Sequence, residues 1–271
     1  MDIGLKGKRA LVTGASRGIG RAIAEALAAE GCALQMLARN AEALDAAAAE
    51  IGRRYGVAVA THAIDLSRSG AAEEAAAQYA DVDIVVNNAG STPRGDILSV
   101  DEDAWRQGWD LKVFGYINLT REFYRHMQAR GDGVIINIIG ISAEKYEYAY
   151  AAGGTGNAAL AAMTRIVGGA SLDHGVRVLG VHPGWVETGK ARRSLMGRAA
   201  AELGDEQRWP ELVKSWPRGR LIQPEEVANV VAFLASPRAG AMSGTIVTVD
   251  AGFTSRGYPY VAKQPAPRKQ A

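Results

Sequence analysis

The chain has little of several features that would mark particular classes of protein. Its 271 residues include one cysteine, Cys32, which excludes an intrachain disulfide and a cysteine-cluster metal site and fits a reducing cytoplasm. Basic and acidic side chains nearly balance, 31 against 29, so no strong positive field points to nucleic acid. No run of 18 apolar residues is present, and the first residues do not read as a signal peptide. We therefore expect a cytoplasmic protein that binds neither nucleic acid nor membrane.

Two further kinds of site lack support in the sequence. The four histidines, His62, His126, His174 and His182, are scattered without metal-ligand spacing, so we expect structural roles for them and no metal. No G-x-S-x-G segment is present, which removes the usual signature of a serine hydrolase.

Glycine is abundant, with 32 residues, about 12% of the chain against a usual share of about 7%. Short apolar runs alternate with helical patterns. We expect strands at residues 9–12, 32–37, 57–64, 82–87, 134–139, 176–181 and 245–249. We expect helices at residues 18–30, 41–55, 71–80, 103–130, 157–169 and 225–234. This alternation predicts an α/β fold, a single doubly wound Rossmann-type domain over residues 1–256 with a seven-stranded, mostly parallel sheet covered by helices on both faces.

Two segments lie outside that alternation. Residues 187–220 are polar, contain Trp209 and Trp216, and interrupt the last repeat beyond a strand end. We expect a substrate lid there, with a surface helix pair of no special role as the alternative. Residues 257–271 carry three prolines and are expected to form an extended tail that packs on a partner subunit.

A glycine-rich loop, TGASRGIG at residues 13–20, stands between a predicted strand and a predicted helix. Gly14 allows a sharp turn, Gly18 lets the backbone approach a pyrophosphate, and Gly20 lets the helix pack closely on the sheet. The helix N-terminus adds N–H donors and a positive dipole. The loop therefore predicts a dinucleotide site.

Four motifs in this order resemble those of the short-chain dehydrogenase/reductase family, from residue 8 to about residue 252. They are TGASRGIG, NNAG at 87–90, HPGWVET at 182–188 and SGTIVTVDAG at 243–252. The resemblance implies that Asp65 meets the adenine and that the 183–188 segment holds the nicotinamide end. The cofactor residues it implies are Gly14, Ser16, Arg17, Gly18, Ile19, Gly20, Asp65, Leu66, Asn88, Ala89, Gly90, Pro183, Gly184, Val186 and Thr188.

The choice of cofactor follows from charge at the end of the second strand. NAD binders place a carboxylate there to accept from the ribose 2′-hydroxyl, whereas this chain reads Leu37-Ala38-Arg39. Arg39 and Arg17 could clamp a 2′-phosphate, although two solvated arginines would look the same. We predict NADP(H) in preference to NAD(H).

The resemblance breaks at the catalytic residues. The family uses an asparagine, a serine, a tyrosine and a lysine, with the tyrosine and lysine four residues apart. The corresponding positions here hold Lys112, Gly140, Gly153 and Asn157. All four differ.

One hypothesis is that neighbouring residues rebuild the site, with Tyr150, Ser142, Lys112 and Asn157 as the candidate catalytic residues. If the helix extends back to Tyr150, its ring could enter the space that Gly153 frees, and an extended strand end would aim Ser142 the same way. Lys112 could then supply the positive charge that promotes proton exchange at Tyr150.

The second hypothesis is a protein that binds the nucleotide but has lost dehydrogenase chemistry and acts as a sensor. Glycines inside a helix cost about 1 kcal/mol each relative to alanine, so Gly153, Gly154 and Gly156 indicate a need for space. Close approach of helices between subunits would explain them as well as room for a substrate.

The partners are the least determined. Lys190, Arg192, Arg193 and Arg198 in the lid hint at a small anionic substrate, although a solvated helix face explains them equally. The family resemblance implies a homotetramer or dimer. The helix with Trp105, Trp109, Phe114 and Tyr116 could supply that contact, or those side chains could serve the core.

Overall fold

A computed structural model of the chain describes residues 2–256. Seven strands form one sheet in the order β3-β2-β1-β4-β5-β6-β7. Every neighbouring pair is parallel, so the expected doubly wound sheet is confirmed and is parallel throughout. The strands are β1 (Arg9–Thr13), β2 (Ala33–Ala38), β3 (Val59–Ala63), β4 (Ile84–Asn87), β5 (Gly133–Ile138), β6 (Val176–Pro183) and β7 (Ile246–Val249). The predicted tail at 257–271 lies outside the described residues.

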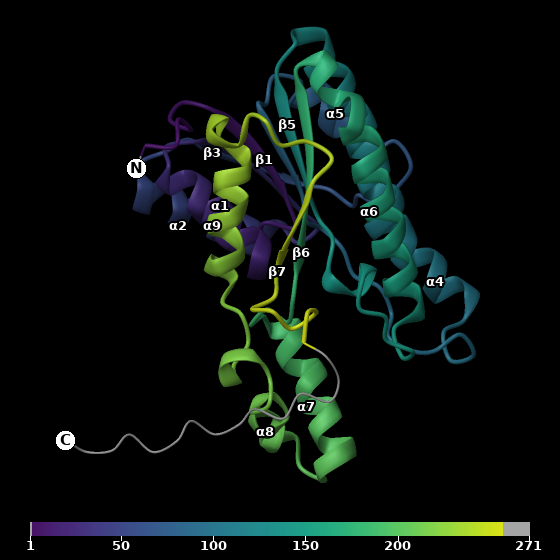
Figure 1. The fold of residues 1–271 in the computed structure, drawn as a ribbon. Coiled ribbons are helices and arrows are strands. Elements are labelled where there is room, and N and C mark those ends of the chain that lie inside the picture. The colour runs from purple at the N-terminus through teal and green to yellow at the C-terminus, as the bar shows by residue number, and fades with distance from the viewer. Residues whose placement is uncertain (1, 257–271) are drawn as a thin grey trace, which may run out of the picture.

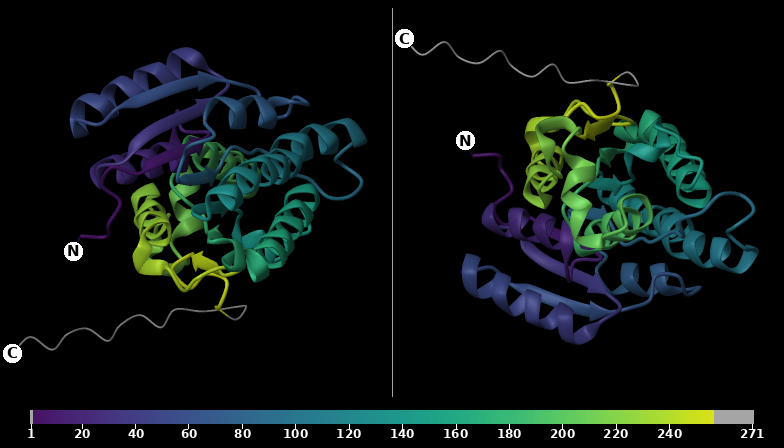
Figure 2. Two further views of the ribbon diagram at one scale, coloured as in Figure 1. Left: turned by 90° about the horizontal axis from the view of Figure 1, so that it is seen from above. Right: turned by 90° about the horizontal axis from the view of Figure 1, so that it is seen from below.

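Helices cover both faces of this sheet (Figures 1 and 2). One layer contains α1 (Gly18–Ala29), α2 (Ala41–Tyr55) and α9 (Pro224–Ala235). The other contains α3 (Ala71–Gln78), α4 (Glu102–Trp109), α5 (Gly115–Arg130) and α6 (Ala151–Ser171). The strands β4, β5 and β6 are buried along their whole length, which explains why their sequences are mostly apolar and do not alternate between apolar and polar residues.

The predicted helix at 103–130 is continuous but contains one irregular turn. Asp101 caps its start by accepting a hydrogen bond from the Ala104 amide at 2.8 Å. A π-helical turn at Asp110–Phe114 separates α4 from α5 and contains Lys112. Such turns often occur at functional sites, because they re-aim a side chain without breaking the helix.

The segment after β6 extends beyond the carboxyl ends of the strands (Figure 1). It contains α7 (Gly189–Leu203) and α8 (Trp209–Val213). Leu195, Val213 and Leu221 form a small buried cluster of its own, with Trp209 and Trp216 packed against it. This segment is therefore a folded unit with its own core, at the sheet edge where ligands bind in doubly wound folds.

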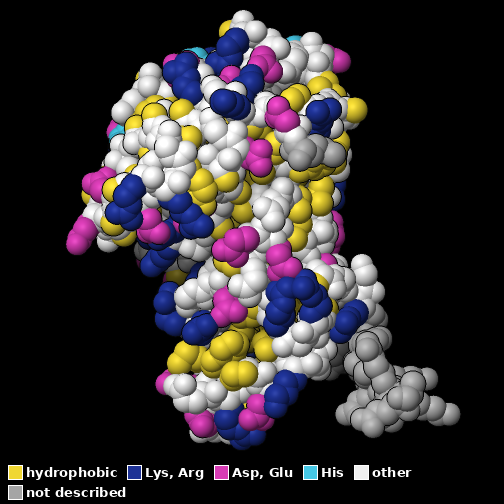
Figure 3. All heavy atoms as spheres, turned by 90° about the vertical axis from the view of Figure 1, so that its left-hand side faces the viewer, with side chains coloured by type: hydrophobic (Ala, Val, Ile, Leu, Met, Phe, Trp, Pro, Cys, Tyr) yellow, Lys and Arg dark blue, Asp and Glu magenta, His cyan; other side chains and the backbone are white. Residues whose placement is uncertain are grey.

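The surface offers no large area of one charge in the view of Figure 3, where basic and acidic side chains are interspersed. Within residues 2–256, no helix is both long and apolar enough to cross a membrane. Over the same residues, no three histidine, cysteine or carboxylate side chains gather where they could hold a metal ion.

Candidate functional site

The glycine loop joins β1 to α1 and packs against the segment after β4. Gly14 and Gly18 adopt left-handed backbone angles, with φ of 66° and 58°. A Cβ on Gly14 would lie 2.9 Å from Asn88 Nδ2 and 3.0 Å from Ala89 Cα, and a Cβ on Gly20 would overlap the Asn88 amide. Thr13 Oγ1 accepts hydrogen bonds from the amides of Asn88 and Ala89 at 2.8 and 2.9 Å. Two motifs that lie 75 residues apart in the chain thus form one surface.

The N-terminus of α1 suits a pyrophosphate. Its N-cap residue, Arg17, makes no side-chain capping bond, so the first amides of a twelve-residue helix keep their donors for another acceptor. Ser16 and Ile19 are half-buried beside them. These features fit the phosphates of a dinucleotide.

Arg17 and Arg39 are exposed, and neither forms an ion pair with any residue between 2 and 256. Asp65 lies in the turn after β3, where its Oδ1 accepts from the Ser67 hydroxyl at 2.7 Å. That bond lowers the pKa of Asp65, and the charge of Arg39 contributes in the same direction. Leu66, the next residue, is buried. No carboxylate lies at the end of β2, as expected from the sequence.

The segment after β6 reaches over the glycine loop. Pro183 ends the strand, and a Cβ on Gly184 would crowd Asp250 at 2.9 Å. Val186 is buried, and Thr188 Oγ1 caps α7 by accepting from the Ala191 amide at 3.2 Å. The Thr188 methyl group lies 3.3 Å from where a Cβ on Gly18 would stand, so these two predicted cofactor segments meet.

Tyr150 is the N-cap residue of α6, so the helix extends back to Ala151 and stops one residue short of including Tyr150. Its ring nevertheless covers Gly153, where any Cβ would overlap it. Its hydroxyl lies 2.7 Å from Thr92 Oγ1. The guanidinium of Arg94 lies over the ring, 4.8 Å from its centroid.

Lys112 forms its hydrogen bonds at the end of β5 and with Tyr116. Its Nζ donates to Ile138 O at 2.6 Å, Ile139 O at 3.2 Å and the Tyr116 hydroxyl at 3.1 Å. Its stem passes over Gly90, where a Cβ would overlap it. Burial lowers the pKa of Lys112 to about 7, and the charge of Lys190 adds to that effect. No hydrogen bond or ring contact in the described part of the chain joins Lys112 to Tyr150.

Ser142 and Asn157 form a buried pair. Asn157 Nδ2 donates to Ser142 Oγ at 2.7 Å, and a Cβ on Gly140 would stand 2.9 Å from the same nitrogen. Residues Ile141–Ala143 form a 3₁₀ turn, so the extended conformation does not persist to Ser142, which nevertheless contacts Asn157. Asn157 Oδ1 is buried and has no hydrogen-bond partner among the described residues. An acceptor of this kind suits a ribose hydroxyl, so the residues present fit a nicotinamide dinucleotide.

Some residues at this site carried no signal in the sequence. Thr92 and Arg94 lie in the loop after β4, and Trp185 lies in the segment after β6. Their position just past the carboxyl ends of parallel strands is the general signal that could have selected them.

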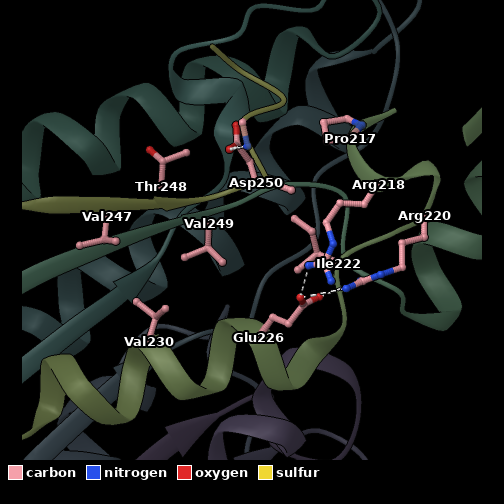
Figure 4. Close-up of a pocket in the computed structure, with 12 residues that line it drawn as sticks. Pro217, Arg218, Arg220, Ile222, Glu226, Val230, Val247, Thr248, Val249 and Asp250 are labelled. Carbon is pink, nitrogen blue, oxygen red and sulfur yellow. Dashed lines mark hydrogen bonds and ion pairs between the residues drawn. The ribbon is translucent and has the colours of Figure 1, made fainter. Parts of the chain in front are cut away.

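A cavity of about 410 Å³ lies elsewhere, between α9, β7 and the turn before α9 (Figure 4). Arg218 and Arg220 pair there with Glu226, which lowers the pKa of that carboxyl to about 2. None of the predicted site residues lines it.

Comparison with known proteins shows the relationships of the chain. Residues 14–254 match the family model described as enoyl-(acyl carrier protein) reductase. The chain is 36% identical to galactitol 2-dehydrogenase (L-tagatose-forming) of Cereibacter sphaeroides over 92% of this chain and 96% of the relative. It is 34% identical to cis-4-hydroxycyclohexanecarboxylate dehydrogenase of Sinomonas cyclohexanicum over 91% of this chain and 96% of the relative. The structure is similar to that of L-sorbose reductase from Gluconobacter frateurii complexed with NADPH and L-sorbose, with a TM-score of 0.86 and 30% sequence identity. The match covers 94% of this chain and 100% of the reductase chain.

Proposed function

The chain belongs to the short-chain dehydrogenase/reductase family, and on that premise we propose that it transfers a hydride between NADP(H) and a small carbonyl or alcohol substrate, with Tyr150 as proton donor. By the family resemblance, Gly153 corresponds to the position of the family's catalytic tyrosine. The observation that supports the proposal is the ring of Tyr150, which fills the space above Gly153. A phenol thus stands near the expected position although the residue that supplies it has changed.

The cofactor, when bound, supplies or accepts the hydride. The N-terminus of α1 and the glycine loop would hold its phosphates, and Asn157 Oδ1 would accept from a ribose hydroxyl. Arg39 and Arg17 favour NADP(H), because they are exposed without carboxylate partners among the described residues. Asp65 and the 183–188 segment complete the proposed cofactor site.

Proton transfer would rest on the chain's own residues. During reduction the Tyr150 hydroxyl would give its proton to the substrate oxygen, and Thr92 holds that hydroxyl in place at 2.7 Å. Arg94 puts a positive charge beside the ring, which stabilises the negative charge left behind. Ser142 Oγ accepts from Asn157, so the serine proton remains free to orient the substrate oxygen.

Lys112 has a different place in this scheme from the one its sequence position implied. By holding the carbonyls of Ile138 and Ile139, it orders the end of β5 from which the Ser142 turn begins. Its contribution to catalysis would be to position that turn.

The α7–α8 segment would act as the substrate lid. Lys190 Nζ donates to Ser91 Oγ at 3.2 Å, which connects the start of α7 to the loop after β4. We also keep the prediction of a homotetramer or dimer in the cytoplasm. Phe114, 49% exposed, is available for such a contact, whereas Trp109 and Tyr116 pack in the chain's own core.

The deciding experiment replaces Tyr150 with phenylalanine. Without the hydroxyl, kcat should fall by about 10²–10⁴, while NADPH binding stays as in the wild type. Tyr148→Phe is the matched control, because Tyr148 is 77% exposed in the same segment and should keep full activity. Unchanged turnover in Tyr150→Phe would remove Tyr150 as proton donor.

The second candidate is a nucleotide-binding sensor without dehydrogenase activity. It is favoured by the glycines at 140 and 153 and the asparagine at 157, which leave none of the family's usual side chains at those positions. NADPH binding by the wild-type protein, with no turnover across panels of ketones and alcohols, would support the sensor.

A further inference from the structure

Two segments that follow β4 and β6, two strands of the same half of the sheet, are joined above the site. Lys190 at the start of α7 donates to Ser91 in the loop after β4 at 3.2 Å. In the same loop, Arg94 lies 5.5 Å from the Trp185 ring centroid and 4.8 Å from that of Tyr150. Arg94 and Lys190 therefore stand on neighbouring parts of one wall, next to the proposed proton donor.

This wall carries more positive than negative charge. Arg94 has one carboxylate partner, Glu147, at 2.6 Å. Lys190 and Lys112 have none among residues 2–256, and burial together with the neighbouring positive charges lowers the pKa of both. Lys190 has no counterion among the described residues and is repelled by the Arg94 guanidinium, so an anion bound beside these two side chains is favoured.

The other charged side chains nearby already have partners of their own. Glu187 pairs with Arg192 at 2.5 Å, and Glu144 pairs with Arg165 at 3.4 Å. Lys145 donates to the Phe253 carbonyl at 3.3 Å. Neither of these carboxylates neutralises Lys190, so the wall formed by Arg94 and Lys190 keeps its excess of positive charge.

We propose that Arg94 and Lys190 bind an anionic group on the substrate, so that the enzyme acts on a hydroxy or keto acid, or a phosphate ester, in preference to a neutral polyol. The inference rests on the proposed function for the reaction and adds the substrate class. The flat guanidinium is held against two rings and keeps donors free for paired anionic oxygens. Because Arg94 also touches Tyr150, the anion would be held close to the carbon that reacts.

The test uses three probes with one six-carbon chain: sorbitol, gluconate and sorbitol 6-phosphate. Oxidation by NADP⁺ is followed for the wild type, Arg94→Gln and Lys190→Gln, with Arg53→Gln as the control. Arg53 is exposed in the last turn of α2 and belongs to none of the proposed sites. We expect the wild type to prefer one of the anions over sorbitol. Each site variant should reduce that preference about 10- to 100-fold in kcat/KM, and Arg53→Gln should leave it unchanged.

Two binding measurements separate the sources of failure. NADPH titration of Lys190→Gln shows whether Lys190 binds the cofactor phosphates. If this variant binds NADPH more weakly than the wild type but keeps the same preference for anionic substrates, the inference is overturned. Calorimetry of gluconate and sorbitol 6-phosphate with the NADP⁺-loaded protein needs no turnover. Anion binding that both site variants weaken would uphold the inference even if no oxidation occurs. Turnover of sorbitol equal to that of the anions, or no anion binding at millimolar concentration, would overturn it whether or not the proposed function holds.

Discussion

Three glycines near the start of α6 meet three different neighbours. Gly153 lies under the Tyr150 ring, and Gly154 has only ordinary contact with Ser142 O at 3.6 Å. Gly156 packs against the π turn, since a Cβ there would come within 3.0 Å of Val113 and 3.3 Å of the Trp109 indole nitrogen. Gly153 therefore leaves room for a ring, and Gly156 allows two helical segments of the same chain to pack closely.

Substitution by alanine should separate these roles. A helix interior gains up to about 1 kcal/mol when glycine becomes alanine without a clash. Gly169→Ala, with nothing within 4 Å of the new Cβ, should show that gain in urea unfolding and keep full activity. Gly153→Ala should displace the Tyr150 ring and lower kcat toward the level of Tyr150→Phe. Full activity in Gly153→Ala would mean that the ring position observed here is not needed.

At the scale of elements, the end of α9 depends on one buried side chain from the sheet. Arg177 in β6 is 7% exposed, and its guanidinium donates to Leu234 O at 2.6 Å, Ala235 O at 3.0 Å, Ser236 O at 3.1 Å and Ala239 O at 3.3 Å. The last carbonyls of a helix lack hydrogen-bond partners within it. A cation at this end also interacts favourably with the negative end of the helix dipole. Arg177 thus fastens the helix to the strand.

Replacing Arg177 with methionine should destabilise the fold strongly. The change leaves several buried carbonyls without donors, so the free energy of unfolding should fall by about 3 kcal/mol or more in urea titrations. Arg198→Met removes an exposed pair and should cost less than about 1 kcal/mol. Similar losses in the two variants would contradict the capping role.

The elements themselves followed from the sequence to within a few residues, because their periodicity and burial are local properties. The π turn at Asp110–Phe114 did not, since the helical pattern of 103–130 is continuous through it. The start of α6 at Ala151 was also missed by six residues, because glycines at 153, 154 and 156 weaken a helical pattern that tertiary packing then supports.

At the scale of the whole molecule, cofactor binding should stabilise the native state selectively. We expect NADPH to raise the Tm more than NADH at equal concentration, because a ligand that binds the native state more tightly stabilises it more. Arg39→Gln should weaken NADPH binding about 10-fold or more, with little effect on NADH. Arg53→Gln, an exposed arginine at the end of α2, is the control. Equal shifts by both cofactors in the wild type would contradict the proposed preference.

The sequence by itself determined the doubly wound architecture and the glycine loop between β1 and α1. Both depend on local patterns: apolar periodicity, and glycine where a tight turn has a positive φ. Only the tertiary structure decided what surrounds the reacting position. Arg94, Tyr150 and Trp185 come from three loops far apart in the chain and meet because parallel strands end at one edge. For the same reason Lys112, aimed by a π turn, binds the carbonyls at the end of β5, a contact that no spacing in the sequence indicates.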